Sequence, residues 1–135
     1  MCGCVVKCGH AWLSASPRNR FTGSIPVGLG RCVSLTNLDA SNCRLNGVIE
    51  RGFLRGALRL ERLDCHRNMI CGPLPGEELA ALSRLRELNL SENKLTGLVA
   101  VEMPNRLRSL ERLILSHNFL RDRLPSTLMN LKACT

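Results

Sequence analysis

The sequence predicts an α/β solenoid in which a parallel sheet lines the concave side and short helical or irregular segments return along the convex side. A leucine pattern recurs every 25 residues, starting at Leu60, Leu85 and Leu110. Each of these units contains Leu-x-x-Leu-x-Leu, with Cys65 in place of the third leucine in the first unit, and an asparagine three positions later. The chain is 44% hydrophobic but only 3% aromatic, so its core has to be aliphatic. We expect the units to wind into a curved, right-handed superhelix.

The repeat sets the domain boundaries. Four full units begin at Leu35, Leu60, Leu85 and Leu110, and a partial unit precedes them. We therefore predict three regions: a degenerate N-terminal segment over 1–18 that is poorly ordered, a repeat domain over 19–132, and a tail over 133–135. Because no polar closing unit follows the last repeat, its C-terminal end should pack on missing repeats or on a partner.

The Leu-x-Leu part of each unit predicts a short strand, because alternate side chains of a strand point to opposite faces. The inward residues would be Leu38 and Ala40, Leu63 and Cys65, Leu88 and Leu90, and Leu113 and Leu115. Each buried leucine contributes about 1.5–3 kcal/mol.

A polar ladder should follow the strands. One amide side chain both donates and accepts, so it can satisfy backbone groups left unpaired at a tight turn. The ladder would comprise Asn19, Cys43, Asn68, Asn93 and Asn118. Gly23, Gly47, Gly72 and Gly97 lie four residues later, where a turn with positive φ is expected.

The returning segments should seat one or two helical turns. The apolar residues available for them are Leu54 and Leu58, Leu79 and Leu82, Met103 and Leu107, and Leu128 and Leu131. Arg51, Arg55 and Arg59 would share one face if this segment were helical, which would suit an anionic partner. The glycines at 52 and 56 weaken such a helix, so we favour a solvated return segment.

The continuation Leu-x-Gly-x-Ile/Leu-Pro makes the pattern more specific, with Arg20–Gly30 as its best example. It resembles the plant-type leucine-rich repeats of receptor-like kinase ectodomains and polygalacturonase-inhibiting proteins. The resemblance implies a non-catalytic module that binds a protein or peptide on its concave face, receptor-like or inhibitor-like. It also implies a place at the cell surface or outside the cell, although residues 1–10 lack the apolar run of a signal peptide.

Two outward columns should carry alternating charge: Asn37, Arg62, Glu87 and Arg112, beside Thr36, Glu61, Arg86 and Glu111. Exposed pairs are worth about 0–1 kcal/mol, so we assign them to solubility and weak pairing between units.

The candidate surface for a partner consists of polar and apolar side chains at the outward positions of the strands and just after them. These are Arg62, Asp64, His66, Arg67, Ser91, Arg112, Ile114, Ser116, His117 and Phe119. Ile114 and Phe119 would be the apolar anchors. Phe119 could equally fold over the edge of the core.

Other functions find less support. The net charge of +8 permits an acidic partner, but the scarcity of aromatic residues disfavours nucleic-acid binding. We expect no cofactor and no metal, because the spacing of Cys2, Cys4, Cys8 and His10 fits no strong zinc pattern. Asp64, His66 and Ser91 could form an accidental triad, yet no oxyanion donors accompany them, so we predict no enzyme. No segment is apolar enough to span a membrane.

Two alternatives stay open: a fragment of a larger receptor-like kinase ectodomain without activity of its own, and an intracellular scaffold that binds an anionic partner. The disulfide state of the eight cysteines, glycosylation of Asn89 and the oligomeric state are also left open by the sequence.

Overall fold

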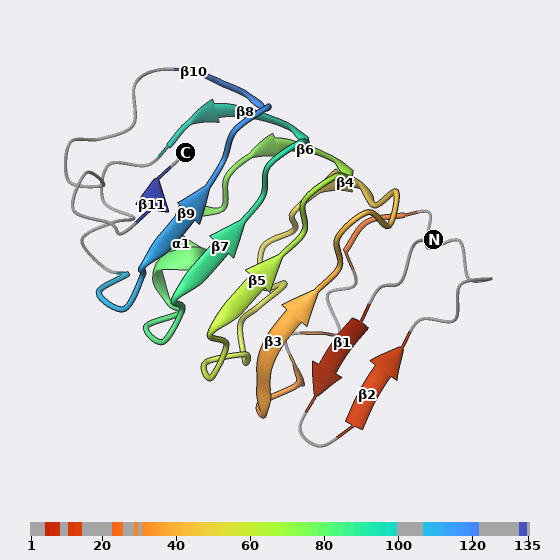
Figure 1. Cartoon of the computed structure of the whole chain (residues 1–135), viewed down its shortest axis with the longest axis vertical. Helices are drawn as coiled ribbons and strands as arrows, with labels where there is room; N and C mark the ends of the chain where they lie inside the picture. Colours follow the sequence, from red (N-terminus) through yellow and green to blue (C-terminus); the bar gives the residue numbers. More distant parts are fainter. Residues whose placement is uncertain are drawn as a thin grey trace.

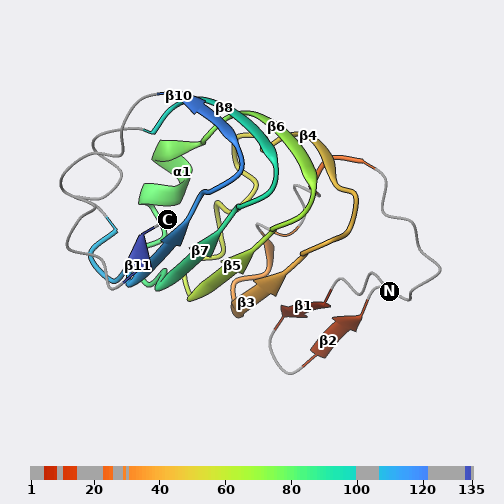
Figure 2. The same ribbon diagram turned by 45° about the horizontal axis from the view of Figure 1, so that its top comes forward.

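Two sheets and one short helix wind into a solenoid in the computed structural model of this chain (Figures 1 and 2). The structure describes residues 5–8, 11–14, 23–25, 29, 31–99, 107–121 and 133–134. The seven-stranded sheet has the order β11-β9-β7-β5-β3-β1-β2, and the second sheet has the order β10-β8-β6-β4. The predicted solenoid of parallel strands is confirmed.

The seven-stranded sheet comprises β1 (Val5–Cys8), β2 (Ala11–Ser14), β3 (Leu35–Asp39), β5 (Arg62–Asp64), β7 (Glu87–Asn89), β9 (Arg112–Ile114) and β11 (Ala133–Cys134). From β3 to β9 the strands are parallel and pair equivalent positions of successive units: Asn37 with Arg62, Arg62 with Glu87, and Glu87 with Arg112. All eight residues predicted to face inward from these strands and their exits are buried.

The N-terminal end of this sheet differs from the repeat. There β1 is antiparallel to both β2 and β3. That residues 1–18 are poorly ordered stays a prediction. A strand at the end of a sheet leaves a row of backbone groups without partners, and β1 supplies those partners to β3. The leucine pattern is absent from this segment and therefore gave no sign of the pairing.

The second sheet comprises β4 (Asn46–Val48), β6 (Met69–Pro73), β8 (Lys94–Leu98) and β10 (Phe119–Arg121), all parallel. Its register pairs Asn46 with Met69, Cys71 with Lys94, and Thr96 with Phe119. Each strand is thus displaced by two residues relative to the 25-residue repeat. The glycine pattern predicted only a turn at this place, and the glycines do have positive φ: +80° at Gly47, +81° at Gly72 and +86° at Gly97.

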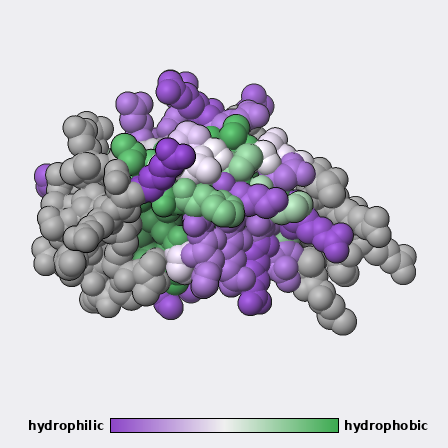
Figure 3. All heavy atoms as spheres, turned by 90° about the horizontal axis from the view of Figure 1, so that it is seen from above, coloured by the Kyte–Doolittle hydropathy of each residue, from purple (hydrophilic) through white to green (hydrophobic). Residues whose placement is uncertain are grey.

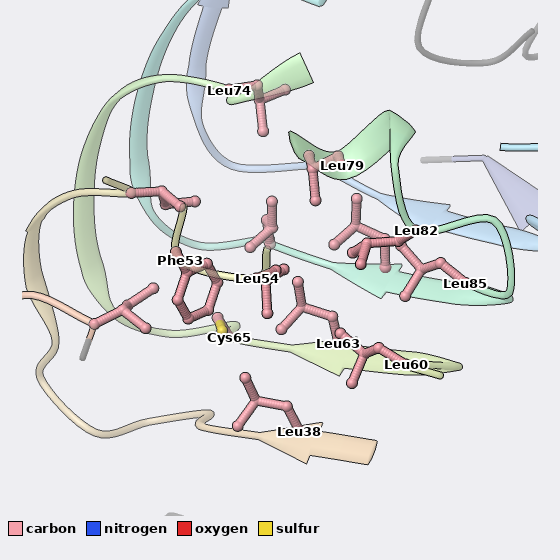
Figure 4. Close-up of a cluster of buried hydrophobic side chains, with 14 of the residues drawn as sticks. Leu38, Phe53, Leu54, Leu60, Leu63, Cys65, Leu74, Leu79, Leu82 and Leu85 are labelled. Atoms are coloured by element: carbon pink, nitrogen blue, oxygen red, sulfur yellow. The ribbon is translucent and has the colours of Figure 1, made fainter. Parts of the chain in front are cut away.

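The core between the sheets is almost wholly aliphatic (Figure 4). Leu63 and Leu38 point into it from the seven-stranded sheet, and Leu79 enters from α1 (Gly76–Ala80), the one helix in the described part of the chain. Leu82 and Leu107 are also buried, as predicted from the returning segments.

The return after β4 corrects one expectation. Residues 51–56 form turns instead of a helix, so the predicted pairing of Leu54 with Leu58 does not hold. Phe53, Leu54 and Ala57 are buried, while Leu58 is 54% exposed. The same turns mean that Arg51, Arg55 and Arg59 do not share a helical face. Met103, Leu128 and Leu131 lie outside the described residues.

Candidate functional site

The asparagine ladder ties neighbouring units together from inside. The side-chain amide of Asn68 donates to the carbonyl oxygens of Ala40, Cys65 and His66 at 2.8, 2.9 and 3.2 Å. Its Oδ1 accepts from the backbone N–H groups of Cys43 and Leu45 at 3.0 and 2.9 Å. Asn93 and Asn118 repeat this arrangement one and two units later. The role predicted for Asn68, Asn93 and Asn118 is therefore what the structure shows.

The other two ladder positions differ. Cys43, whose side chain is disulfide-bonded, takes part through its backbone N–H, which donates to Asn68. Its side chain therefore does not replace the asparagine amide there. Asn19 lies outside the described residues.

A column of left-handed residues immediately precedes the ladder, and the sequence analysis missed it. Asn42, Arg67, Glu92 and His117 have φ of +54°, +55°, +53° and +56°. Non-glycine residues rarely adopt this conformation, and asparagine is among those that tolerate it best. Asn42 was therefore the one residue of this column whose type could have indicated a left-handed backbone from the sequence. Two residues of the predicted partner surface, Arg67 and His117, are thus fixed by the turn of the solenoid.

Ion pairs between units neutralise much of the predicted surface. Arg62 pairs with Glu87 at 2.9 Å and Arg67 with Glu92 at 2.9 Å. Arg86 pairs with Glu111 at 2.7 Å, and its hydrogen bond to that carboxylate raises the pKa of Arg86. Arg62–Glu87 and Arg86–Glu111 lie in the two predicted columns, so the predicted pairing of opposite charges is confirmed there, and Arg67–Glu92 is a further pair outside those columns. The side chains are largely exposed, so solvent screening leaves these pairs little effect on stability.

Asp64, His66 and Ser91 do not form a catalytic arrangement. His66 Nδ1 lies 2.7 Å from Asp64 Oδ1, as expected for same-face neighbours. Ser91 is 7% exposed, and its hydroxyl donates to Asn89 Oδ1 at 2.8 Å. A nucleophile needs a hydrogen bond to its base, and no hydrogen bond within the described residues joins Ser91 to His66.

A hydrogen bond from a backbone N–H to the side-chain oxygen two residues earlier recurs in three units, which indicates a structural role. Ser41 N–H donates to Asp39 Oδ1, His66 N–H to Asp64 Oδ1, and Ser91 N–H to Asn89 Oδ1, at 3.0, 3.0 and 3.2 Å. A side-chain oxygen that accepts from the backbone two residues later stabilises a turn. Asp64 therefore stabilises the turn after β5, and Ser91 takes part in the equivalent turn after β7.

Four predicted residues keep their side chains without a partner: Arg112, Ile114, Ser116 and His117, which we call the C-terminal quartet. No side-chain hydrogen bond or ion pair joins any of them to another described residue. Ile114 is half-buried on β9, opposite Asn89 of β7 in the register. The quartet is the part of the predicted surface that remains available for contact.

Phe119, the second predicted anchor, lies elsewhere. It belongs to β10 of the second sheet and is 67% exposed, so it is on a different sheet from Ile114 and does not cover the edge of the core. Val48, Met69 and Leu98 are also exposed apolar residues of the second sheet, at 47%, 40% and 61%. Figure 3, which views the molecule from the side of this sheet, shows apolar atoms scattered among polar ones.

The described residues hold neither a metal-ligand cluster nor a membrane-spanning helix. No group of three or more His, Cys, Asp or Glu side chains suited to a metal lies within the described ranges. No helix among the described residues has the length and apolar character to cross a bilayer. Cys2, Cys4 and His10 fall outside those ranges.

The sequence and the fold match known proteins consistently. The family model described as Leucine Rich Repeat matches residues 34–55, 84–105 and 109–131. Receptor-like protein 41 of Arabidopsis thaliana is 31% identical over 116 residues, which cover 85% of this chain and 13% of that protein. The chain spans only 9% to 14% of the three Arabidopsis receptor-like proteins that it matches.

Solved structures show the same likeness. The plant peptide hormone receptor RGFR1, solved in complex with RGF2, superposes with a TM-score of 0.73 at 34% identity, covering 79% of this chain and 17% of the receptor chain. The BIR3–SERK2 complex from Arabidopsis thaliana gives a TM-score of 0.80 at 29% identity, covering 96% of this chain and 76% of the matched chain.

Proposed function

Because the chain is a leucine-rich-repeat protein of the plant type that resembles receptor ectodomains, we propose that it is a non-catalytic module that binds a polypeptide on its seven-stranded sheet. The observation that carries the proposal is the C-terminal quartet. The side chains of Arg112, Ser116 and His117 offer hydrogen-bonding groups near the half-buried side chain of Ile114, and none of these side chains has a hydrogen bond or ion pair with another described residue. An apolar anchor surrounded by polar groups is the arrangement that concentrates binding energy in protein interfaces.

The remaining predicted residues contribute less to this proposal. Arg62 and Arg67 would have to exchange Glu87 and Glu92 for a ligand carboxylate, and Asp64 would have to release His66. Ser91 is buried and bonded to Asn89. We therefore propose that contact centres on β9 and its exit, with His66 and Arg67 at the margin. The likeness to a receptor solved with its peptide hormone supports a polypeptide as the ligand.

Peptide display tests the proposal without a known ligand. Peptides would be selected on the wild-type protein and then measured against Ile114→Arg and, as the matched control, Leu98→Arg on the second sheet. Ile114→Arg should weaken binding by tenfold or more, since a charge replaces the apolar anchor, which is worth at least about 1.4 kcal/mol. Leu98→Arg should leave binding unchanged.

Circular dichroism on both variants would first establish that they fold. If Leu98→Arg abolished binding and Ile114→Arg did not, the binding surface would be the second sheet and the proposal would be wrong. Arg67→Glu and Phe119→Ala extend the test to two predicted residues outside the quartet.

A further inference from the structure

A shallow cavity of about 460 Å³ lies at the edge of the seven-stranded sheet where β7 and β9 begin. It is lined by Glu61, Arg84, Arg86, Arg108, Ser109, Leu110 and Glu111. None of these residues belongs to the C-terminal quartet. Three arginines and two glutamates thus share one concave surface, and their pairing decides what the cavity can bind.

Arg86 interacts with the carboxylates that line the cavity. Arg86 donates to Glu111 Oε1 from Nε at 3.1 Å and from Nη2 at 2.7 Å. The pKa of Arg86 is raised, chiefly by the hydrogen bond and charge of Glu111 and to a smaller degree by the nearby charge of Glu61. Glu111 is therefore paired with Arg86, and Glu61 adds a weaker charge effect on the same guanidinium.

The other two arginines of the cavity are not paired with a carboxylate of any described residue. Arg84 and Arg108 are exposed, and neither forms a side-chain hydrogen bond or ion pair with any described residue. They come from the turns that lead into β7 and β9, two strands that are neighbours in the sheet and so about 4.8 Å apart. The hydroxyl of Ser109, also exposed, has no hydrogen bond within the described part of the chain. Two guanidinium groups and a hydroxyl thus line one cavity with no hydrogen-bond acceptor among the described residues.

We propose that this cavity binds an oxyanion: a sulfate, phosphate or carboxylate group. A guanidinium presents parallel N–H donors that match two oxygens of such a group, and the hydrogen bonds are strengthened by charge. An anion between Arg84 and Arg108 also relieves the repulsion of two like charges on adjacent turns. The Ser109 hydroxyl supplies a third donor. The site is separate from the polypeptide surface proposed above and needs no polypeptide to be occupied.

Titration with small anions tests the site directly. Sodium sulfate, sodium phosphate and sodium acetate would be added to the ¹⁵N-labelled protein at fixed pH and ionic strength, following the amide signals of Arg84, Arg108 and Ser109. Arg84→Gln and Arg108→Gln should each weaken the apparent affinity roughly fivefold, the upper range for an exposed charge pair. The matched control is Arg59→Gln: Arg59 occupies the position of Arg84 one unit earlier, is exposed, and lies outside the cavity.

Saturable shifts that the two cavity variants weaken and Arg59→Gln does not would support the site, and the order of the three anions would identify the group it prefers. If Arg59→Gln weakened binding as much as Arg84→Gln, the shifts would reflect the overall positive charge and the proposal would fail. It would also fail if no anion moved these signals. Since no polypeptide is present, either result leaves the proposed function to its own test.

Discussion

The side-chain nitrogen of Asn93 lies 2.9 Å from the carbonyl oxygen of Cys65, 28 residues earlier in the chain. This hydrogen bond crosses from one unit to the preceding one inside the solenoid. The same amide donates to Leu90 and Ser91 within its own unit, and its oxygen accepts from the N–H of Ile70. One side chain thus satisfies backbone groups of two units, and removing it should loosen their junction.

Asn93→Ala should therefore destabilise the protein by about 3 kcal/mol, because buried backbone groups left without partners cost about 1–3 kcal/mol each and are only partly rescued by water. Urea unfolding followed by circular dichroism would measure the loss. Asn46→Ala is the control, since Asn46 is exposed and its side chain has no hydrogen bond among the described residues; its effect should stay within about 0.5 kcal/mol. Equal effects of the two substitutions would contradict a bridging role for Asn93.

Gly72→Ala should destabilise the protein more than Gly97→Ala. Both glycines have positive φ, +81° and +86°, so both substitutions carry a backbone cost of about 1 kcal/mol. A Cβ at Gly72 would additionally lie 2.7 Å from a methyl carbon of Val48, whereas a Cβ at Gly97 would meet Pro73 at 3.6 Å. Melting temperatures of the two variants would show the difference. Adding Val48→Ala should recover part of the loss in Gly72→Ala only.

His117→Gly should leave stability unchanged or raise it by up to about 1 kcal/mol, although glycine usually weakens a folded chain. His117 has φ of +56°, and a side chain in that conformation costs about 1–2 kcal/mol, which offsets the entropy that glycine loses on folding. Lys94→Gly in β8 is the comparison and should lower stability by about 0.5–1 kcal/mol. Urea midpoints would rank the two variants; the opposite order would rule out strain at His117.

The thiol of Cys65 should make stability fall in alkaline solution. Burial raises the pKa of this thiol, with smaller contributions from Asp64 and Asp39. Above about pH 8.5 the unfolded thiol loses its proton while the folded one keeps it. The folded state then binds more protons, so its stability decreases as the pH rises.

Unfolding free energies at pH 7.5 and 9.5 would measure this effect. The decrease should be smaller by about 1 kcal/mol in Cys65→Ala, which carries no thiol at that position. Iodoacetamide should also label the half-buried Cys71 in the native protein and leave Cys65 unlabelled until the chain unfolds, because only the thiolate reacts. Rapid native labelling of Cys65 would show that its site is open to solvent.

Much of the architecture could be predicted because it repeats. The 25-residue period placed Leu38, Leu63, Leu88 and Leu113 in the core, and the ladder roles of Asn68, Asn93 and Asn118 followed from amide chemistry. The second sheet could not be predicted, since its strands pair with a displacement of two residues that no sequence period reveals. The helix expected over Leu54 and Leu58 failed because the glycines at 52 and 56 favour turns.

The candidate site was predicted less well, for a related reason. A repeat shows which side chains point outward, but not which of them already have partners. The sequence by itself determined the solenoid, the aliphatic core and the outward columns, because each depends on periodicity and residue chemistry alone. Only the tertiary structure decided that Arg67 is held by Glu92, that Ser91 is buried against Asn89, and that Phe119 belongs to another sheet than Ile114. The Arg67–Glu92 pair and the position of Phe119 depend on how successive units pack, and the burial of Ser91 depends on the turn that ends β7.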